Sequence, residues 1–196
     1  VVCWGENGYG QLGYGDLASR GDTTGSMGTS LGRLELGFAS FPAIVNLTSV
    51  DESSGFWIEG FSGGDHGGWA VAGGGDVNLD GLSDIVVSAP SAGNGSGEVY
   101  VVFGRSSGMG ASVQVGDLDG DNGFKIVGVN SSAGAAGWSV AFGDVQSDGY
   151  SDVLIGAPFA NAYGDGSTGE AYSVFGRTGS FDATVYLSSL TVGDKG

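Results

Sequence analysis

Hydrophobic residues along this chain form short runs, separated by glycine-rich polar segments, with no long apolar stretch. The clearest alternation of apolar and polar positions lies in two similar segments, Gly97–Arg105 and Gly169–Arg177. A period of two residues is that of a strand with one buried face. Two further runs, Ile85–Val87 and Val153–Ile155, are apolar throughout, which predicts fully buried strands. Since no segment sustains an apolar period of 3.6, the pattern predicts an all-β fold.

These strands recur in a fixed order, so the chain contains internal repeats. The segment 75–90, GDVNLDGLSDIVVSAP, returns at 143–158 as GDVQSDGYSDVLIGAP, with nine of the sixteen positions identical. Phe41–Gly60 similarly returns as Met109–Gly128, and a truncated third copy occupies residues 181–196. Each full repeat holds a Gly-Phe strand, a strand led by tryptophan, an acidic loop with its buried strand, and an alternating strand. Four strands in a unit of this size predict a propeller blade of antiparallel strands.

Each copy of the sixteen-residue segment begins with an acidic loop whose oxygen-bearing side chains occupy alternate positions. A glycine follows the third of them, where a sharp bend needs a residue that tolerates positive φ. Alternate side chains point inward in such a loop, and a backbone carbonyl adds an oxygen to the about six to eight that calcium prefers. The predicted ligands of Ca²⁺ are Asp76, Asn78, Asp80, the Leu82 carbonyl and Asp84 in the first loop, and Asp144, Gln146, Asp148, the Tyr150 carbonyl and Asp152 in the second.

The alternative interpretation is that both loops are ordinary turns, because Asp, Asn and Gly are also the commonest turn residues. The same spacing in both copies, each followed by the same kind of strand, favours calcium. Asp117, Asp119 and Asp121 alternate as well, and they form either a third cation site or a turn before the Gly-Phe strand.

The repeats resemble the FG-GAP family, whose blades occur in the integrin α head and in many secreted bacterial and algal proteins. The residues that carry the resemblance are Phe103-Gly104 and Phe175-Gly176 for the FG, and Ser88-Ala89-Pro90 and Gly156-Ala157-Pro158 for the GAP. The family has a D-x-[DN]-x-D-G-x-x-D calcium loop between these motifs, so the resemblance implies calcium in both loops. Gln146 departs from that pattern, and a longer neutral ligand should weaken the second site.

The first residues follow a different pattern. Cys3-Trp4-Gly5, Asn7 and Gly10–Gly13 resemble one repeat of the regulator-of-chromosome-condensation family. The expected organisation is this segment at 1–37, FG-GAP blades at 38–107 and 108–179, and the start of a further blade at 180–196. Two blades do not close a ring, so we expect a partial or open propeller. The chain is then either a piece of a longer propeller or a subunit whose open ends pair with other copies.

The composition narrows the range of partners. The formal net charge of −16 argues against nucleic acid and anionic membrane surfaces, and no run is long enough for membrane insertion. One cysteine, Cys3, excludes an internal disulfide, and the start at Val1 suggests a mature or excised piece. Three sequons, at Asn46, Asn94 and Asn130, favour a secreted glycoprotein.

These features predict a non-enzymatic, calcium-stabilised extracellular protein that acts in adhesion or in a surface or filament assembly. Its partners would be proteins bound through blade faces or edges, including copies of itself in a homopolymer. His66 is the only histidine, and we expect no catalytic dyad or triad around it. The alternative is a non-catalytic propeller module of a larger secreted enzyme, since some phospholipases carry FG-GAP blades beside a catalytic domain.

Overall fold

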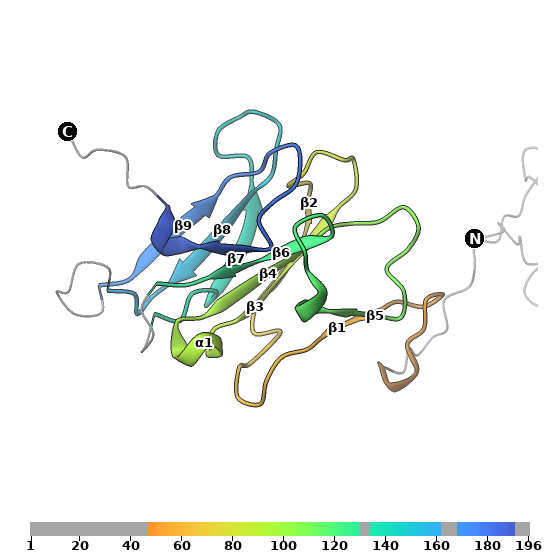
Figure 1. Cartoon of the computed structure of the whole chain (residues 1–196), viewed down its shortest axis with the longest axis horizontal. Coiled ribbons are helices and arrows are strands. Elements are labelled where there is room, and N and C mark those ends of the chain that lie inside the picture. The colour runs from red at the N-terminus through yellow and green to blue at the C-terminus, as the bar shows by residue number, and fades with distance from the viewer. Residues whose placement is uncertain (1–46, 130–133, 162–167, 191–196) are drawn as a thin grey trace, which may run out of the picture. The chain divides into compact units, whose positions relative to one another are not determined.

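The computed structural model describes residues 47–129, 134–161 and 168–190 (Figure 1). The chain divides into two compact units, Val1–Ile44 and Val45–Gly196, and every described residue lies in the second. The segment that resembles a regulator-of-chromosome-condensation repeat therefore lies outside the described residues, and so do Cys3, Asn46 and Asn130.

The described part of the chain consists of strands and short helical turns, which confirms the predicted all-β fold. The strands are β1 (Trp57–Glu59), β2 (Val71–Gly75), β3 (Asp84–Ala89), β4 (Glu98–Val102), β5 (Ser112–Gln114), β6 (Gly123–Val127), β7 (Ser139–Gly143), β8 (Asp152–Ala157), β9 (Glu170–Val174) and β10 (Thr184–Tyr186). The turns are η2 (Leu47–Ser49), α1 (Ala92–Gly95), η3 (Val115–Asp117) and η4 (Leu187–Ser189). No described helix is both long and apolar enough to cross a membrane.

The first blade is a sheet with the strand order β10-β6-β4-β3-β2. Its strands β2, β3, β4 and β6 are antiparallel neighbours, as a propeller blade requires, and β10 adds a parallel strand beside β6. The pairing places Val86 opposite Val101 and Tyr100 opposite Lys125.

The second blade is the sheet β7-β8-β9, which is antiparallel throughout. A separate pair, β1 and β5, is parallel. This pair corresponds to the pair of β6 and β10. In both pairs, a strand at a Gly-Phe sequence lies parallel to the first strand of the next sequence repeat.

The boundaries of the sheets do not coincide with those of the sequence repeats. β6 belongs to the predicted segment 108–179, yet it pairs with β4 and completes the first blade. β10 lies in the segment 180–196, expected to open a further blade, and instead it extends this same sheet. The pairing of β6 satisfies the edge of β4, which would otherwise present unpaired backbone groups.

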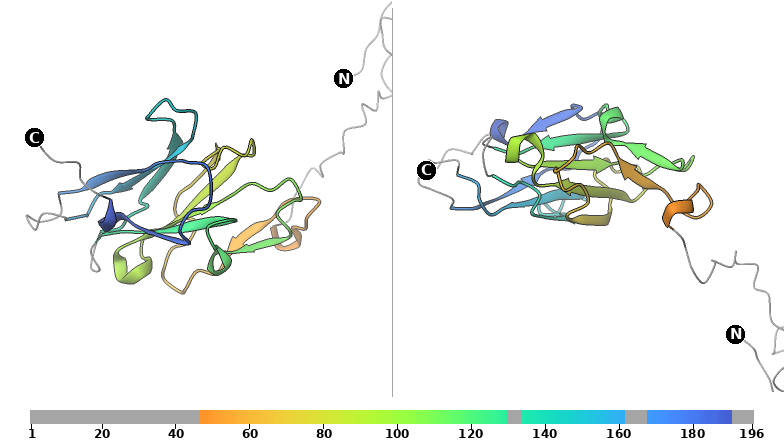
Figure 2. Two further views of the ribbon diagram at one scale, coloured as in Figure 1. Left: turned by 45° about the horizontal axis from the view of Figure 1, so that its top comes forward. Right: turned by 90° about the horizontal axis from the view of Figure 1, so that it is seen from below.

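The main core lies between the two blades, which Figures 1 and 2 show lying beside each other. One face of the first blade contributes Val86, Val99 and Val101, each fully buried, and the second blade contributes Val153 and Ile155. Each such side chain stabilises the fold by about 1.5–3 kcal/mol. A second cluster covers the opposite face of the first blade, where Tyr100 and Val102 meet side chains from β1 and β5.

Candidate metal centre

The first acidic loop joins β2 to β3 and is curled by its own carboxylates. The Asp76 oxygens accept the backbone N–H groups of Asp80 at 3.0 Å and Gly81 at 2.9 Å. Asp80 Oδ1 in turn accepts the N–H of Leu82 at 2.8 Å. Leu79 and Gly81 have φ values of 57° and 84°, so the chain turns sharply where the sequence predicted a bend. Together these bonds direct the side chains of Asp76 and Asp80 to the inside of the curl.

Asp84 closes the loop from the first position of β3. It is fully buried, and its two oxygens accept the N–H of Val77 at 2.7 Å and of Gly104 at 2.9 Å. Burial raises the pKa of the Asp84 carboxyl, and the negative charges of Asp80 and Asp76 raise it further. The residue therefore ties the loop to the FG motif after β4, at the cost of burying a charge.

The second loop, between β7 and β8, has the same geometry. Asp144 accepts the N–H groups of Asp148 at 3.1 Å and Gly149 at 3.0 Å, and Asp148 accepts that of Tyr150 at 3.1 Å. Asp152 is fully buried and accepts the N–H of Val145 at 2.9 Å and of Gly176 at 3.0 Å. The structure therefore places the equivalent predicted aspartates of the two repeats in equivalent positions.

The loops differ in two respects. Asn78 accepts the N–H of Asp80 and donates to its carboxylate at 2.9 Å, whereas no such bond joins Gln146 to Asp148. The first loop also lies between the blades, since Val77 is fully buried and its counterpart Val145 is 55% exposed.

Backbone hydrogen bonds tie the first loop to the second blade. The carbonyl of Asp76 accepts the N–H of Ser151, and that of Val77 accepts the N–H of Arg177, both at 2.9 Å. The geometry of the first loop is therefore coupled to the packing between the blades.

The donor set of each loop suits calcium. All the donors are hard oxygens, and each carboxylate oxygen that accepts one N–H keeps a second lone pair. The ion pair found among the described residues joins Lys125 to Glu98, so no described Lys or Arg neutralises the loop carboxylates. As the described side chains stand, no three His, Cys, Asp or Glu groups converge into a metal cluster. A cation could be held inside the curl only if the carboxylates rotated toward it.

The FG glycine is needed because the chain passes close to the acidic loop. A Cβ on Gly104 would lie 2.6 Å from the Ser83 carbonyl oxygen and 2.9 Å from Leu82 Cβ. We expect Gly104→Ala to lower the free energy of unfolding by about 1–3 kcal/mol, because backbone must move to relieve the clash. Urea denaturation measures this loss. Gly116→Ala is the control, since nothing lies within 4 Å of a Cβ there, and an equal effect of both substitutions would contradict the explanation.

Other predicted sites have ordinary explanations or stay untested. Asp119 Oδ1 accepts the N–H groups of Asp121 and Asn122, and Asn122 donates to the Asp117 carbonyl. These are the bonds of a turn, which was the alternative to a third cation site. Asn94 is exposed and has a left-handed backbone in α1, so its side chain is accessible for glycosylation, which stays a prediction.

The structure also places His66 beside a serine, which the sequence had not indicated. His66 Nδ1 lies 2.9 Å from Ser91 Oγ, and the imidazole packs edge-on against Trp69. Among the described residues, no carboxylate is hydrogen-bonded to this ring, so the pair lacks the third member of a triad. The two residues are 25 positions apart, with β2 and β3 between them, so no local pattern could have brought them together.

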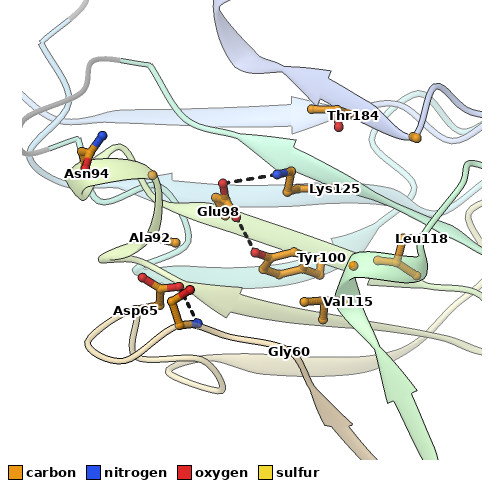
Figure 3. Close-up of a pocket in the computed structure, with 14 residues that line it drawn as sticks. Gly60, Asp65, Ala92, Asn94, Glu98, Tyr100, Val115, Leu118, Lys125 and Thr184 are labelled. Atoms are coloured by element: carbon orange, nitrogen blue, oxygen red, sulfur yellow. Dashed lines mark hydrogen bonds and ion pairs between the residues drawn. The ribbon is translucent and has the colours of Figure 1, made fainter.

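A polar cleft of about 510 Å³ lies along the outer strands of the first blade (Figure 3). Glu98, Tyr100 and Lys125 meet in it. The carboxylate of Glu98 accepts the Tyr100 hydroxyl and lies 3.4 Å from Lys125 Nζ. Burial raises the pKa of Tyr100 well above its usual range, and the hydrogen bond to Glu98 adds to the effect. These three side chains join β4 to β6.

Antiparallel sheets with an acidic loop before each central strand define an all-β protein of propeller type. A model of the FG-GAP repeat matches residues 67–102 and 136–174, so the chain carries two FG-GAP repeats. The first match covers β2 to β4 and the second covers β7 to β9, each with its acidic loop.

Several curated proteins are similar to this chain. Integrin alpha pat-2 of Caenorhabditis elegans is 40% identical over 100 residues, which cover 46% of this chain and 7% of that protein. Phosphatidylinositol-glycan-specific phospholipase D of Bos taurus is 32% identical over 163 residues, 76% of this chain and 17% of that protein. Integrin alpha-M of Mus musculus is 33% identical over 86 residues, 42% of this chain and 7% of that protein. The chain thus spans less than a fifth of the length of these relatives.

Proposed function

We propose that this chain is a non-enzymatic, calcium-stabilised module that holds propeller-type blades rigid and presents them to protein partners at the cell surface or outside the cell. The observation that carries the proposal is the equivalent hydrogen-bonded curl of the two acidic loops, each closed by a fully buried aspartate. Two ordinary turns would not need a buried carboxylate in the same place in both repeats, because burying a charge is costly.

The proposed sites consist of the loop residues already described. One calcium would be held by Asp76, Asn78, Asp80, the Leu82 carbonyl and Asp84. The other would be held by Asp144, Gln146, Asp148, the Tyr150 carbonyl and Asp152. Bound calcium supplies positive charge that offsets three carboxylates in each loop. In the first loop, this would fix the backbone whose carbonyls hold the second blade through Ser151 and Arg177. Rigidity between the blades is the proposed result.

Recognition of protein partners is supported by an exposed aromatic strip that crosses both blades. Trp69 contacts Trp138 with ring centroids 5.0 Å apart, and Trp138 contacts Phe159 at 5.4 Å. All three are 43–50% exposed, although such side chains are usually buried. Exposed aromatic clusters are typical of protein interfaces. Assembly with other copies into a filament is a variant of this proposal, and it requires a strand that fits the edge of β9 beside which no described strand lies.

The proposed location outside the cell rests on the three sequons and on the two acidic loops proposed to bind calcium. Enzymatic activity is left out of the proposal because the pair of His66 and Ser91 is exposed and lacks a carboxylate partner among the described residues.

A second candidate function is that of a non-catalytic propeller module in a larger secreted enzyme. The observation that favours it is the match of 76% of this chain to a protein named as a phospholipase D. Sequencing the whole parent reading frame separates the two candidates, because a catalytic domain on the same polypeptide would favour the second and reject the first.

The calcium sites are tested by Asp80→Ala and Asp148→Ala, each of which removes one central, exposed carboxylate. Native mass spectrometry should count two calcium ions on the wild type and one on each variant. Asp119→Ala is the matched control, because it removes an exposed carboxylate from an acidic turn and should leave both ions in place. Unchanged counts in Asp80→Ala and Asp148→Ala would reject the assigned ligands.

A further inference from the structure

The two acidic loops are joined to each other through their backbones, at the residues of the proposed sites. The carbonyl of Asp76 in the first loop accepts the N–H of Ser151 at 2.9 Å. Ser151 lies between Tyr150 and Asp152, whose carbonyl and carboxylate are proposed ligands of the second site. One hydrogen bond therefore connects a ligand residue of the first loop to a residue between two ligands of the second.

The FG motif of the second repeat makes another connection between the loops. The Asp152 carboxylate accepts the N–H of Gly176 at 3.0 Å. The next residue, Arg177, donates its N–H to the Val77 carbonyl at 2.9 Å. Val77 belongs to the first loop, directly after Asp76. A buried carboxylate of the second site and the backbone of the first loop thus hold the same short segment.

The space around Gly176 shows how closely the two loops approach each other at this segment. A Cβ at Gly176 would lie 2.6 Å from the Ser151 carbonyl oxygen and 2.8 Å from that of Val77, so it would strike both loops. A Cβ on Gly104, the corresponding glycine of the first FG motif, would lie 2.6 Å from the Ser83 carbonyl oxygen. The nearest atoms around Gly104 all belong to the first loop. Gly176 therefore occupies a junction between the loops, whereas Gly104 does not.

The second loop depends on this junction because little else covers it. Residues 144–149 are all exposed, and the loop carries three carboxylates that repel one another. An exposed segment of this kind loses conformational freedom when it is fixed around an ion. Bonds that already hold part of the segment reduce that entropic cost.

We propose that calcium binds to the two loops with positive cooperativity, because an ion in either loop orders the backbone junction that both loops share. This inference rests on the proposed calcium sites. An ion in the first loop fixes the carbonyls of Asp76 and Val77, which hold Ser151 and Arg177, so the second ion meets a loop that is already partly ordered. The coupling is reciprocal, since each ion must change the affinity for the other by the same factor. Repulsion between the two ions is offset, because the three carboxylates of each loop exceed the charge of its ion.

Calorimetric titration of the full chain measures the cooperativity. Asp80→Ala leaves only the second site and Asp148→Ala only the first, so each variant gives one single-site association constant. The product of the two association constants of the wild type should exceed the product of these single-site constants about tenfold. Asp119→Ala controls for the loss of an exposed carboxylate and should leave both wild-type constants unchanged. Equal products, or a smaller product in the wild type, would overturn the cooperativity while both sites remain.

Gly176→Ala tests whether the coupling passes through the junction. Its methyl group would push the two loops apart, so the ratio of the two products should fall to about one when all three chains carry it. Gly104→Ala is the matched control, because the same substitution at the other FG glycine meets only the first loop, and the ratio should stay about tenfold. A ratio that is the same in both backgrounds would overturn the junction as the cause.

Hydrogen exchange in excess chelator tests the same junction without calcium. Gly176→Ala should speed amide exchange in both loops, 76–84 and 144–152, whereas Gly104→Ala should act mainly on the first. Faster exchange of the second loop alone in Gly176→Ala would overturn the proposal. If no calcium binds in the titration, the proposed sites fail together with the cooperativity, whereas two independent binding events reject the cooperativity alone. The titration of the two aspartate variants decides the matter even if Gly176→Ala does not fold.

Discussion

Asp84→Ala is expected to lower the free energy of unfolding by about 2–4 kcal/mol in the presence of a chelator. The substitution leaves the N–H groups of Val77 and Gly104 without an acceptor, and each such buried group costs about 1–3 kcal/mol. The substitution also removes a carboxyl group whose pKa is raised because burial disfavours its charged form. The absence of this buried charge offsets part of the loss. Urea denaturation with circular dichroism measures the difference, and the chelator ensures that bound metal does not contribute.

Two variants make this result specific to the bonds of Asp84. Asp84→Asn keeps the size of the side chain and one acceptor oxygen, so it should cost less than alanine. Asp80→Ala removes an exposed carboxylate from the same loop, and in chelator it should cost least of the three. If all three substitutions have the same effect, Asp84 does not tie the loop to the FG motif.

Removal of calcium is expected to have the second large effect. At a free calcium concentration about 100 times the dissociation constant, each site stabilises the folded chain by about 2.7 kcal/mol, because the unfolded chain does not form the loops. With two sites, chelation should lower the melting temperature by roughly 10 °C or more for a chain of this size. Differential scanning calorimetry in calcium and in excess chelator measures the shift.

The variants of the two loops should respond unequally to chelation. Gln146 makes no bond to Asp148 like that from Asn78 to Asp80, so the second site should be the weaker. The remaining calcium-dependent shift should therefore be larger in Asp148→Ala than in Asp80→Ala. A melting temperature that is the same in calcium and in chelator would show that the loops are turns.

The local features of this fold could be predicted from the sequence. The acidic loops, the bends at Gly81 and Gly149 and the buried strands that follow depend on residues within about ten positions of one another. Such features follow from alternation and from the backbone freedom of glycine. The paired repeats are equally visible in the sequence, because the two sixteen-residue segments share their spacing as well as their residue types.

Features that depend on distant neighbours could not be predicted in this way. Val77 and Val145 occupy the same place in identical Gly-Asp-Val sequences, yet one is fully buried and the other is 55% exposed. The difference arises because a second blade lies against the first loop. The membership of β6 and β10 in the first sheet also depends on pairing across many residues, which periodicity does not encode. Asp84 also accepts the N–H of Gly104, which lies 20 residues further along the sequence. This second role of Asp84 could not be predicted for the same reason.

The most direct test of the calcium sites is a calorimetric titration of calcium into the metal-free full chain. Two binding events of unequal affinity are the predicted result, the tighter one at the loop of Asp76 to Asp84. Magnesium should compete poorly, because it demands octahedral geometry and gives up its water reluctantly. No heat of binding up to millimolar calcium would contradict the central claim that the two acidic loops are metal sites.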